Sequence, residues 1–208
     1  MDNMPQDGSD PRVAIAEVLW FWAALFDGPP PDTAWDAMKV QVWPEITKVS
    51  EPTATLARPS LDQISQEQLT REYQAWFSMP VSGSPFSLYD EEPDAYRDDP
   101  QNLRILAAVV ELPWKKTEFI PGRAYPVSPD HLSVLLALWA VMLSADEGGM
   151  LGVSRDKWLE ILGEKIQRIL TRLVSTLPNA SGYRAIAWTA QQYVEQVRQW
   201  TATDDTER

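Results

Sequence analysis

The sequence contains no cysteine and a single histidine, His131, and these two absences exclude several classes of protein. Without cysteine the chain cannot form disulfides, zinc fingers, iron–sulfur clusters, CxxC redox motifs or a cysteine nucleophile. One histidine cannot supply the paired Glu-x-x-His motifs of a di-iron helical bundle. The signatures GxxxxGK[ST], GxGxxG and GxSxG are absent as well. We therefore expect no metal, no cofactor and no catalytic residue.

Basic residues are scarce in the first half of the chain. The whole protein has 18 Lys+Arg against 30 Asp+Glu, which gives a formal net charge of −12. Residues 1–104 carry 7 basic and 18 acidic side chains, whereas residues 105–208 carry 11 and 12. Such a field repels phosphate backbones and anionic lipids and attracts cations. We expect no nucleic acid ligand; the acidic half is either a solvated surface that keeps the protein soluble or a surface that favours a cationic partner.

Long apolar runs are also missing. The first apolar segment, Val13 to Phe26, includes Glu17 and is too short to span a bilayer. The chain begins Met-Asp-Asn-Met, without the basic start of a secretory signal. The sequence therefore predicts a cytoplasmic protein without stable membrane insertion.

Apolar residues recur at helical spacing along most of the chain, and no alternating strand pattern of any length is present. N-cap residues and prolines mark the starts of several helices: Asp10-Pro11, Ser65 and Ser128-Pro129, with Ser154 opening the longest pattern. The pattern predicts an all-α, single compact domain over residues 1–208. The expected helices cover about 11–26, 32–44, 66–77, 100–112, 129–143, 155–177 and 183–200, with a polar tail over 201–208.

Residues 78–99 form the longest irregular stretch, which contains three prolines and six acidic residues. Loops of this length in a compact chain usually bind a ligand or connect domains. We expect a hinge and binding loop between N-terminal helices in residues 10–77 and C-terminal helices in residues 100–200. Such a hinge also permits helix exchange, so the protein is either a monomer or a helix-swapped dimer.

Aromatic residues and prolines cluster at the start of this loop, where Trp76 and Phe77 precede Pro85, Phe86 and Tyr89. Aromatic rings next to acidic side chains are typical of a groove that binds a peptide. The groove would have an apolar floor and an acidic rim. A ligand with arginines followed by a hydrophobic stretch matches both.

Asp130 and His131 lie beside each other at the start of a strongly apolar helix. In a structural role, Asp130 would favour the helix dipole and His131 would bond to a loop. In a catalytic role the pair would need a nucleophile, and the sequence indicates none. Recognition of a ligand is the third possibility.

Four segments resemble the TorD/DmsD/NarJ-type redox-enzyme maturation chaperones, which are all-helical cytoplasmic proteins that accompany molybdenum enzymes. Residues 72–77 are similar to that family's Tyr-x-x-Leu-Phe helix end, and residues 85–89 to its Pro-(Tyr/Trp)-x-Ser-Val-Tyr loop. Residues 129–132 are similar to the end of its Glu-Pro-x-Asp-His motif, and residues 183–187 to its Tyr-Arg-Ala-Leu-Ala. The sequence departs from the family in both motifs. The loop is one residue shorter, with Phe86 in place of Tyr or Trp and no acidic residue before Ser87, and before Asp130 the glutamate is missing and the proline is displaced.

The resemblance implies a chaperone that is not an enzyme. It would bind the twin-arginine signal peptide, or the N-terminus, of a molybdopterin oxidoreductase subunit and assist cofactor insertion before export. A generic helical interaction module, or a small helical enzyme that uses Asp130 and His131, are the alternatives. The resemblance places the peptide-binding region at Trp76, Pro85, Phe86, Ser87, Tyr89, Asp130 and His131, with Asp130 a candidate acceptor for arginine.

Overall fold

The computed structural model describes residues 10–31, 34–49, 51, 61–77, 86–90, 131–144 and 154–204. Within these ranges the chain is helical, and the only β-structure is an isolated antiparallel bridge between Tyr89 and His131. The predicted all-α fold is confirmed. The helix expected over 100–112, most of the 78–99 hinge, Pro85 and Asp130 lie outside the described residues. The helices are α1 (Pro11–Asp27), α2 (Ala34–Val49), α4 (Gln66–Trp76), α6 (Leu132–Ser144), α7 (Arg155–Thr176) and α8 (Gly182–Asp204).

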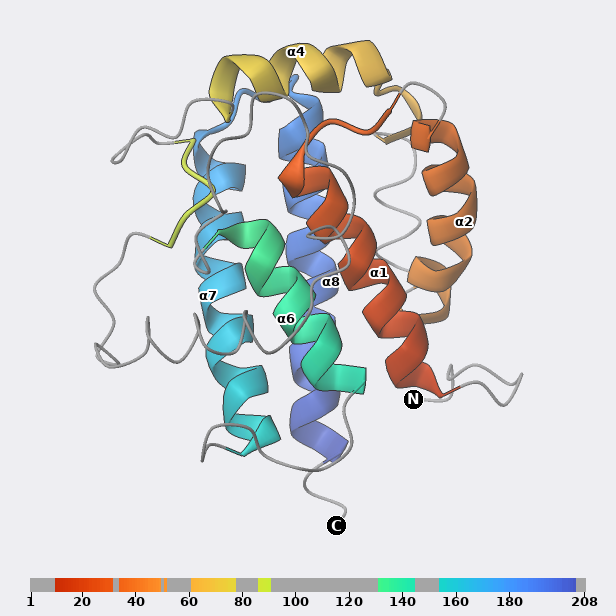
Figure 1. The fold of residues 1–208 in the computed structure, drawn as a ribbon, viewed down its shortest axis with the longest axis vertical. Coiled ribbons are helices and arrows are strands. Elements are labelled where there is room, and N and C mark those ends of the chain that lie inside the picture. The colour runs from red at the N-terminus through yellow and green to blue at the C-terminus, as the bar shows by residue number, and fades with distance from the viewer. Residues whose placement is uncertain are drawn as a thin grey trace.

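Helix α6 occupies the centre of the bundle (Figure 1). It packs between α1 and α7, while α8 packs against α7, and α2 lies on the outer side of α1. Helix α4 runs across one end of the bundle, where it contacts α8. None of the helices in the described ranges is both long and apolar enough to cross a membrane.

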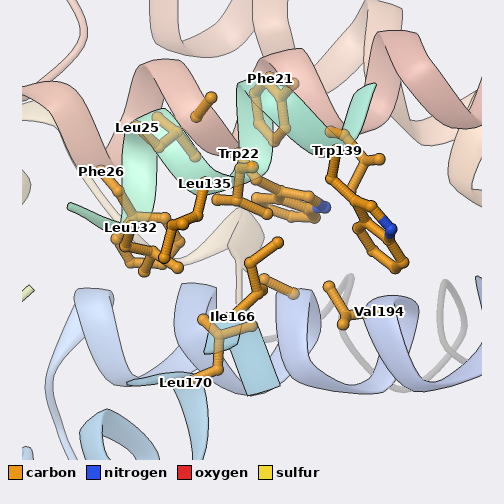
Figure 2. Close-up of a cluster of buried hydrophobic side chains, with 14 of the residues drawn as sticks. Phe21, Trp22, Leu25, Phe26, Leu132, Leu135, Trp139, Ile166, Leu170 and Val194 are labelled. Carbon is orange, nitrogen blue, oxygen red and sulfur yellow. The ribbon is translucent and has the colours of Figure 1, made fainter. Parts of the chain in front are cut away.

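The central position of α6 follows from its composition, because residues 132–144 include no charged side chain. Every residue from 132 to 140 is buried. Figure 2 shows side chains of α1 and α6, including Trp22 and Trp139, above Ile166 of α7 and Val194 of α8. Full burial of an aliphatic or aromatic side chain contributes roughly 1.5–3 kcal/mol, so this cluster supplies much of the driving force for folding.

Three of the predicted N-caps are confirmed. Asp10 accepts a hydrogen bond from the Arg12 amide at 2.9 Å, and Pro11 is the first helical residue. Ser65 and Ser154 accept hydrogen bonds from the amides three residues later, at 3.1 and 3.3 Å. Each cap satisfies one of the amide groups that a helix leaves without an internal partner.

Two predicted helix ends were wrong. We expected the second helix to end near Pro44, but α2 continues through this proline to Val49. A proline removes the hydrogen bond to the carbonyl four residues earlier, here that of Val40. Val40 and Pro44 lie on the exposed side of α2, where water can satisfy that carbonyl. At the other end of the chain, α8 includes residues 201–204 of the expected polar tail, and Trp200 packs against the core there.

The start of α6 also differs from the prediction. The sequence predicted Pro129 as the first helical residue and Asp130 in the first turn, but α6 begins at Leu132. His131 is instead extended and pairs with Tyr89, and the Leu132 amide donates to the Leu88 carbonyl at 2.8 Å. A contact with a segment more than 40 residues earlier in the chain therefore sets the start of this helix.

Candidate functional site

The sequence-predicted site residues that the structure describes come together around the segment 86–90. The rings of Trp76, at the end of α4, and Phe86 stack with centroids 5.6 Å apart and planes 29° from parallel. The rings of Tyr89 and His131 meet edge to face, with centroids 5.0 Å apart. The segment thus contacts both the end of α4 and the start of α6.

These residues differ in how much of each reaches the surface. Trp76, Phe86 and Tyr89 are partly exposed. Ser87 and His131 are buried, with 8% and 6% exposure. The Ser87 hydroxyl accepts a hydrogen bond from the amide of Tyr89 at 3.2 Å. Ser87 and His131 therefore lie on the buried side of the site, and Trp76, Phe86 and Tyr89 form its partly exposed side.

Three cations of α7 contact the segment 86–90, and none of them was among the residues predicted for the site. Arg168 Nη2 lies 2.7 Å and Lys165 Nζ 3.3 Å from the carboxylate of Asp90. Arg172 donates to the carbonyls of Ser87 and Tyr89. Asp90 belongs to the acidic stretch that we expected to form the rim of the groove, but its side chain is 4% exposed. Its charge is directed into the protein.

One signal in the sequence could have found these cations. Lys165 lies at helical spacing from Ile161, Leu162 and Trp158, which form the apolar stripe of α7. A charge within a buried stripe needs a partner of opposite sign, because its desolvation is otherwise too costly. The position of Lys165 thus predicts a buried carboxylate elsewhere in the chain.

Two of the four resembling segments, residues 72–77 at the end of α4 and residues 183–187 at the start of α8, meet beside the site. Glu72 accepts hydrogen bonds from the amides of Gly182 and Tyr183 at 3.1 and 3.0 Å. The Tyr183 ring lies edge-on to Phe77, with centroids 5.1 Å apart, and its hydroxyl donates to the carbonyl of Leu25 at 3.2 Å. Burial raises the pKa of Tyr183 far above its ordinary value, and the nearby Tyr73 and Glu72 raise it further.

His131 takes part in a polar chain at the start of α6. Its Nδ1 lies 2.7 Å from the hydroxyl of Ser133, and that hydroxyl lies 3.5 Å from a carboxylate oxygen of Asp27. A hydrolytic triad has histidine between the carboxylate and the nucleophile. Here Ser133 is the middle member and has no exposed surface. The arrangement connects the end of α1 to the segment 86–90 through the start of α6.

Comparison of the chain with models of known protein families, with curated proteins and with solved structures finds no match.

Proposed function

We propose that this protein is a maturation chaperone that binds the signal peptide or N-terminus of a molybdopterin oxidoreductase subunit before export. The resemblance of its four segments to the TorD/DmsD/NarJ-type chaperones supplies the function. One structural observation supports the proposal: residues from all four segments lie close together. The contacts are those of Trp76 with Phe86, Tyr89 with His131, and Phe77 with Tyr183.

The accessible chemistry suits such a ligand. The partly exposed rings of Trp76, Phe86 and Tyr89 offer an apolar surface to the hydrophobic region of a signal peptide. Burial of apolar area there contributes about 25 cal/mol per Å². The net charge of −12 attracts the arginines of the peptide and accelerates the encounter.

Isothermal titration calorimetry tests the proposal. The protein is titrated with signal peptides and mature N-termini of the molybdoenzymes from the same genome, and each signal peptide is paired with a version in which both arginines are lysine. We expect one peptide to bind, and its lysine version to bind more weakly, because lysine lacks the bidentate geometry of the guanidinium group. Absence of binding by every peptide would refute the proposal.

Two tryptophan variants test the location of the site. Trp76→Ala removes the ring that stacks on Phe86 and should weaken peptide binding at least tenfold. Trp200→Ala is the matched control, because Trp200 is also partly buried against the core but lies about 27 Å along α8 from Gly182. If both variants lose peptide affinity by the same factor, the loss is not specific to Trp76, and the proposed location of the site is wrong. Similar binding of unrelated amphipathic peptides would favour a generic interaction module.

A further inference from the structure

The segment 86–90 is attached to α7 by a buried cluster of charges. The carboxylate of Asp90 contacts Nη2 of Arg168 at 2.7 Å and Nζ of Lys165 at 3.3 Å. The side chains of Asp90 and Lys165 are only 4% and 9% exposed, whereas that of Arg168 is 29% exposed. Removal of one partner from such a cluster leaves an uncompensated buried charge, which strongly destabilises the arrangement.

The backbone of the same segment is held by hydrogen bonds from two helices. Nη2 of Arg172 donates to the carbonyls of Ser87 and Tyr89 at 2.8 and 2.5 Å. The carbonyl between them, that of Leu88, accepts from the amide of Leu132 at 2.8 Å. Three successive carbonyls and the following carboxylate are therefore all bonded to groups of α6 and α7. These bonds hold a segment whose β-pairing, within the described residues, is limited to the bridge between Tyr89 and His131.

From this arrangement we infer that Asp90, Arg168 and Arg172 are positioning residues for the peptide site. They hold the segment so that Phe86 stacks on Trp76 and Tyr89 meets His131, and they do so without contacting the peptide. A surface that is ordered in advance binds more tightly, because less conformational entropy is lost on binding. This inference rests on the proposed function, since it assigns those residues a role in the same site.

Asp90 is not an acceptor for the arginines of the peptide in this arrangement. A carboxylate that contacts two cations of its own protein and is almost fully buried is poorly placed to accept a guanidinium of the ligand. Its removal should therefore weaken the binding of an arginine peptide and of its lysine version by the same factor. A carboxylate in direct contact with the peptide would instead change the ratio of the two affinities.

Asp90→Asn tests this in two measurements, with Glu160→Gln as the matched control. Glu160 also forms an ion pair on α7, with Lys157 at 2.6 Å, but both side chains are exposed. The first measurement is hydrogen exchange of the Leu132 amide without peptide, since that amide donates to the segment. We expect Asp90→Asn to reduce its protection at least tenfold and Glu160→Gln to leave it unchanged.

The second measurement is calorimetry with the arginine and lysine peptides. We expect Asp90→Asn to weaken both at least tenfold with an unchanged affinity ratio. Unchanged exchange at Leu132, or a loss confined to the arginine peptide, would overturn the inference. If Asp90→Asn does not fold, Arg168→Lys and Arg168→Met replace it. Arg168→Lys should retain most of the hydrogen-exchange protection of the Leu132 amide, and Arg168→Met should lose it. Failure of the wild-type protein to bind any peptide would refute the proposed function, whereas the exchange result would still decide whether the cluster positions the segment.

Discussion

Replacement of Glu72 should destabilise the whole fold, although this residue lies outside the main core. Glu72 is in α4, and its carboxylate accepts hydrogen bonds from the amides of Gly182 and Tyr183 and from the Ser181 hydroxyl, at 3.0 to 3.1 Å. Those two amides belong to the first turn of α8, where a helix has no internal acceptors for its amide groups. The carboxylate of one helix thus caps another that is more than a hundred residues away in the sequence.

The magnitude follows from these contacts. A hydrogen bond to a charged group contributes about 1.5–3 kcal/mol, and a carboxylate near a partly buried helix N-terminus contributes up to about 2 kcal/mol. The contributions are not additive, because the same carboxylate makes all of them. We expect Glu72→Ala to lower the free energy of unfolding by roughly 2–4 kcal/mol. The corresponding fall in Tm is roughly 4–16 °C for a chain of this length. Glu72→Gln retains an acceptor oxygen and should lose about half as much.

Urea denaturation followed by circular dichroism measures this loss. The control is Glu67→Gln, which removes an exposed carboxylate from the first turn of the same helix and should cost only a few tenths of a kcal/mol. If Glu72→Ala and the control agree within about 0.5 kcal/mol, the carboxylate does not cap α8 in solution, and the reasoning is wrong.

Three further predictions concern other parts of the bundle. Because burial raises the pKa of folded Tyr183, unfolding releases a proton above about pH 10; the stability is fully present below that pH and should fall above it by up to about 1.4 kcal/mol per pH unit. Stability measured between pH 9 and 11 should fall less steeply in Tyr183→Phe. Leu135→Ala, at a fully buried position of α6, should cost roughly 2–5 kcal/mol in urea denaturation, and a loss below 1 kcal/mol would contradict the central packing of α6. Pro44→Ala restores the amide donor to the carbonyl of Val40 and should raise stability by about 1 kcal/mol; a lower Tm would show that α2 requires the proline.

The helices with local start signals could be predicted from the sequence. Asp10, Ser65 and Ser154 each accept a hydrogen bond from an amide two or three residues later, so the whole signal lies within one helical turn. The central place of α6 was equally accessible, because a helix without charges has no face that requires water. These features depend on short stretches of chain and on composition alone.

The start of α6 could not be predicted in this way. Ser128 and Pro129 are a good local start signal, yet the helix begins at Leu132, because His131 pairs with Tyr89. The bridge joins residues 42 positions apart, so no local pattern in the sequence indicates it. In the folded protein this contact outweighs the preference of Ser128 for an N-cap position. The site depends on the same contact, since Tyr89 and His131 also pack ring against ring.

Helix α7 connects the stability of the bundle to the geometry of the site. Its apolar face includes Ile166 and Leu170, which are buried in the core, and Lys165, Arg168 and Arg172 recur at spacings of three and four along the same helix. The cations therefore share one rigid helix with the core side chains. A shift of α7 caused by repacking of the core would move all three cations together relative to the segment 86–90. Substitutions at Ile166 or Leu170 should thus reduce the hydrogen-exchange protection of the Leu132 amide before they unfold the bundle, because the segment is held by directional bonds and the core by contacts that tolerate small displacements.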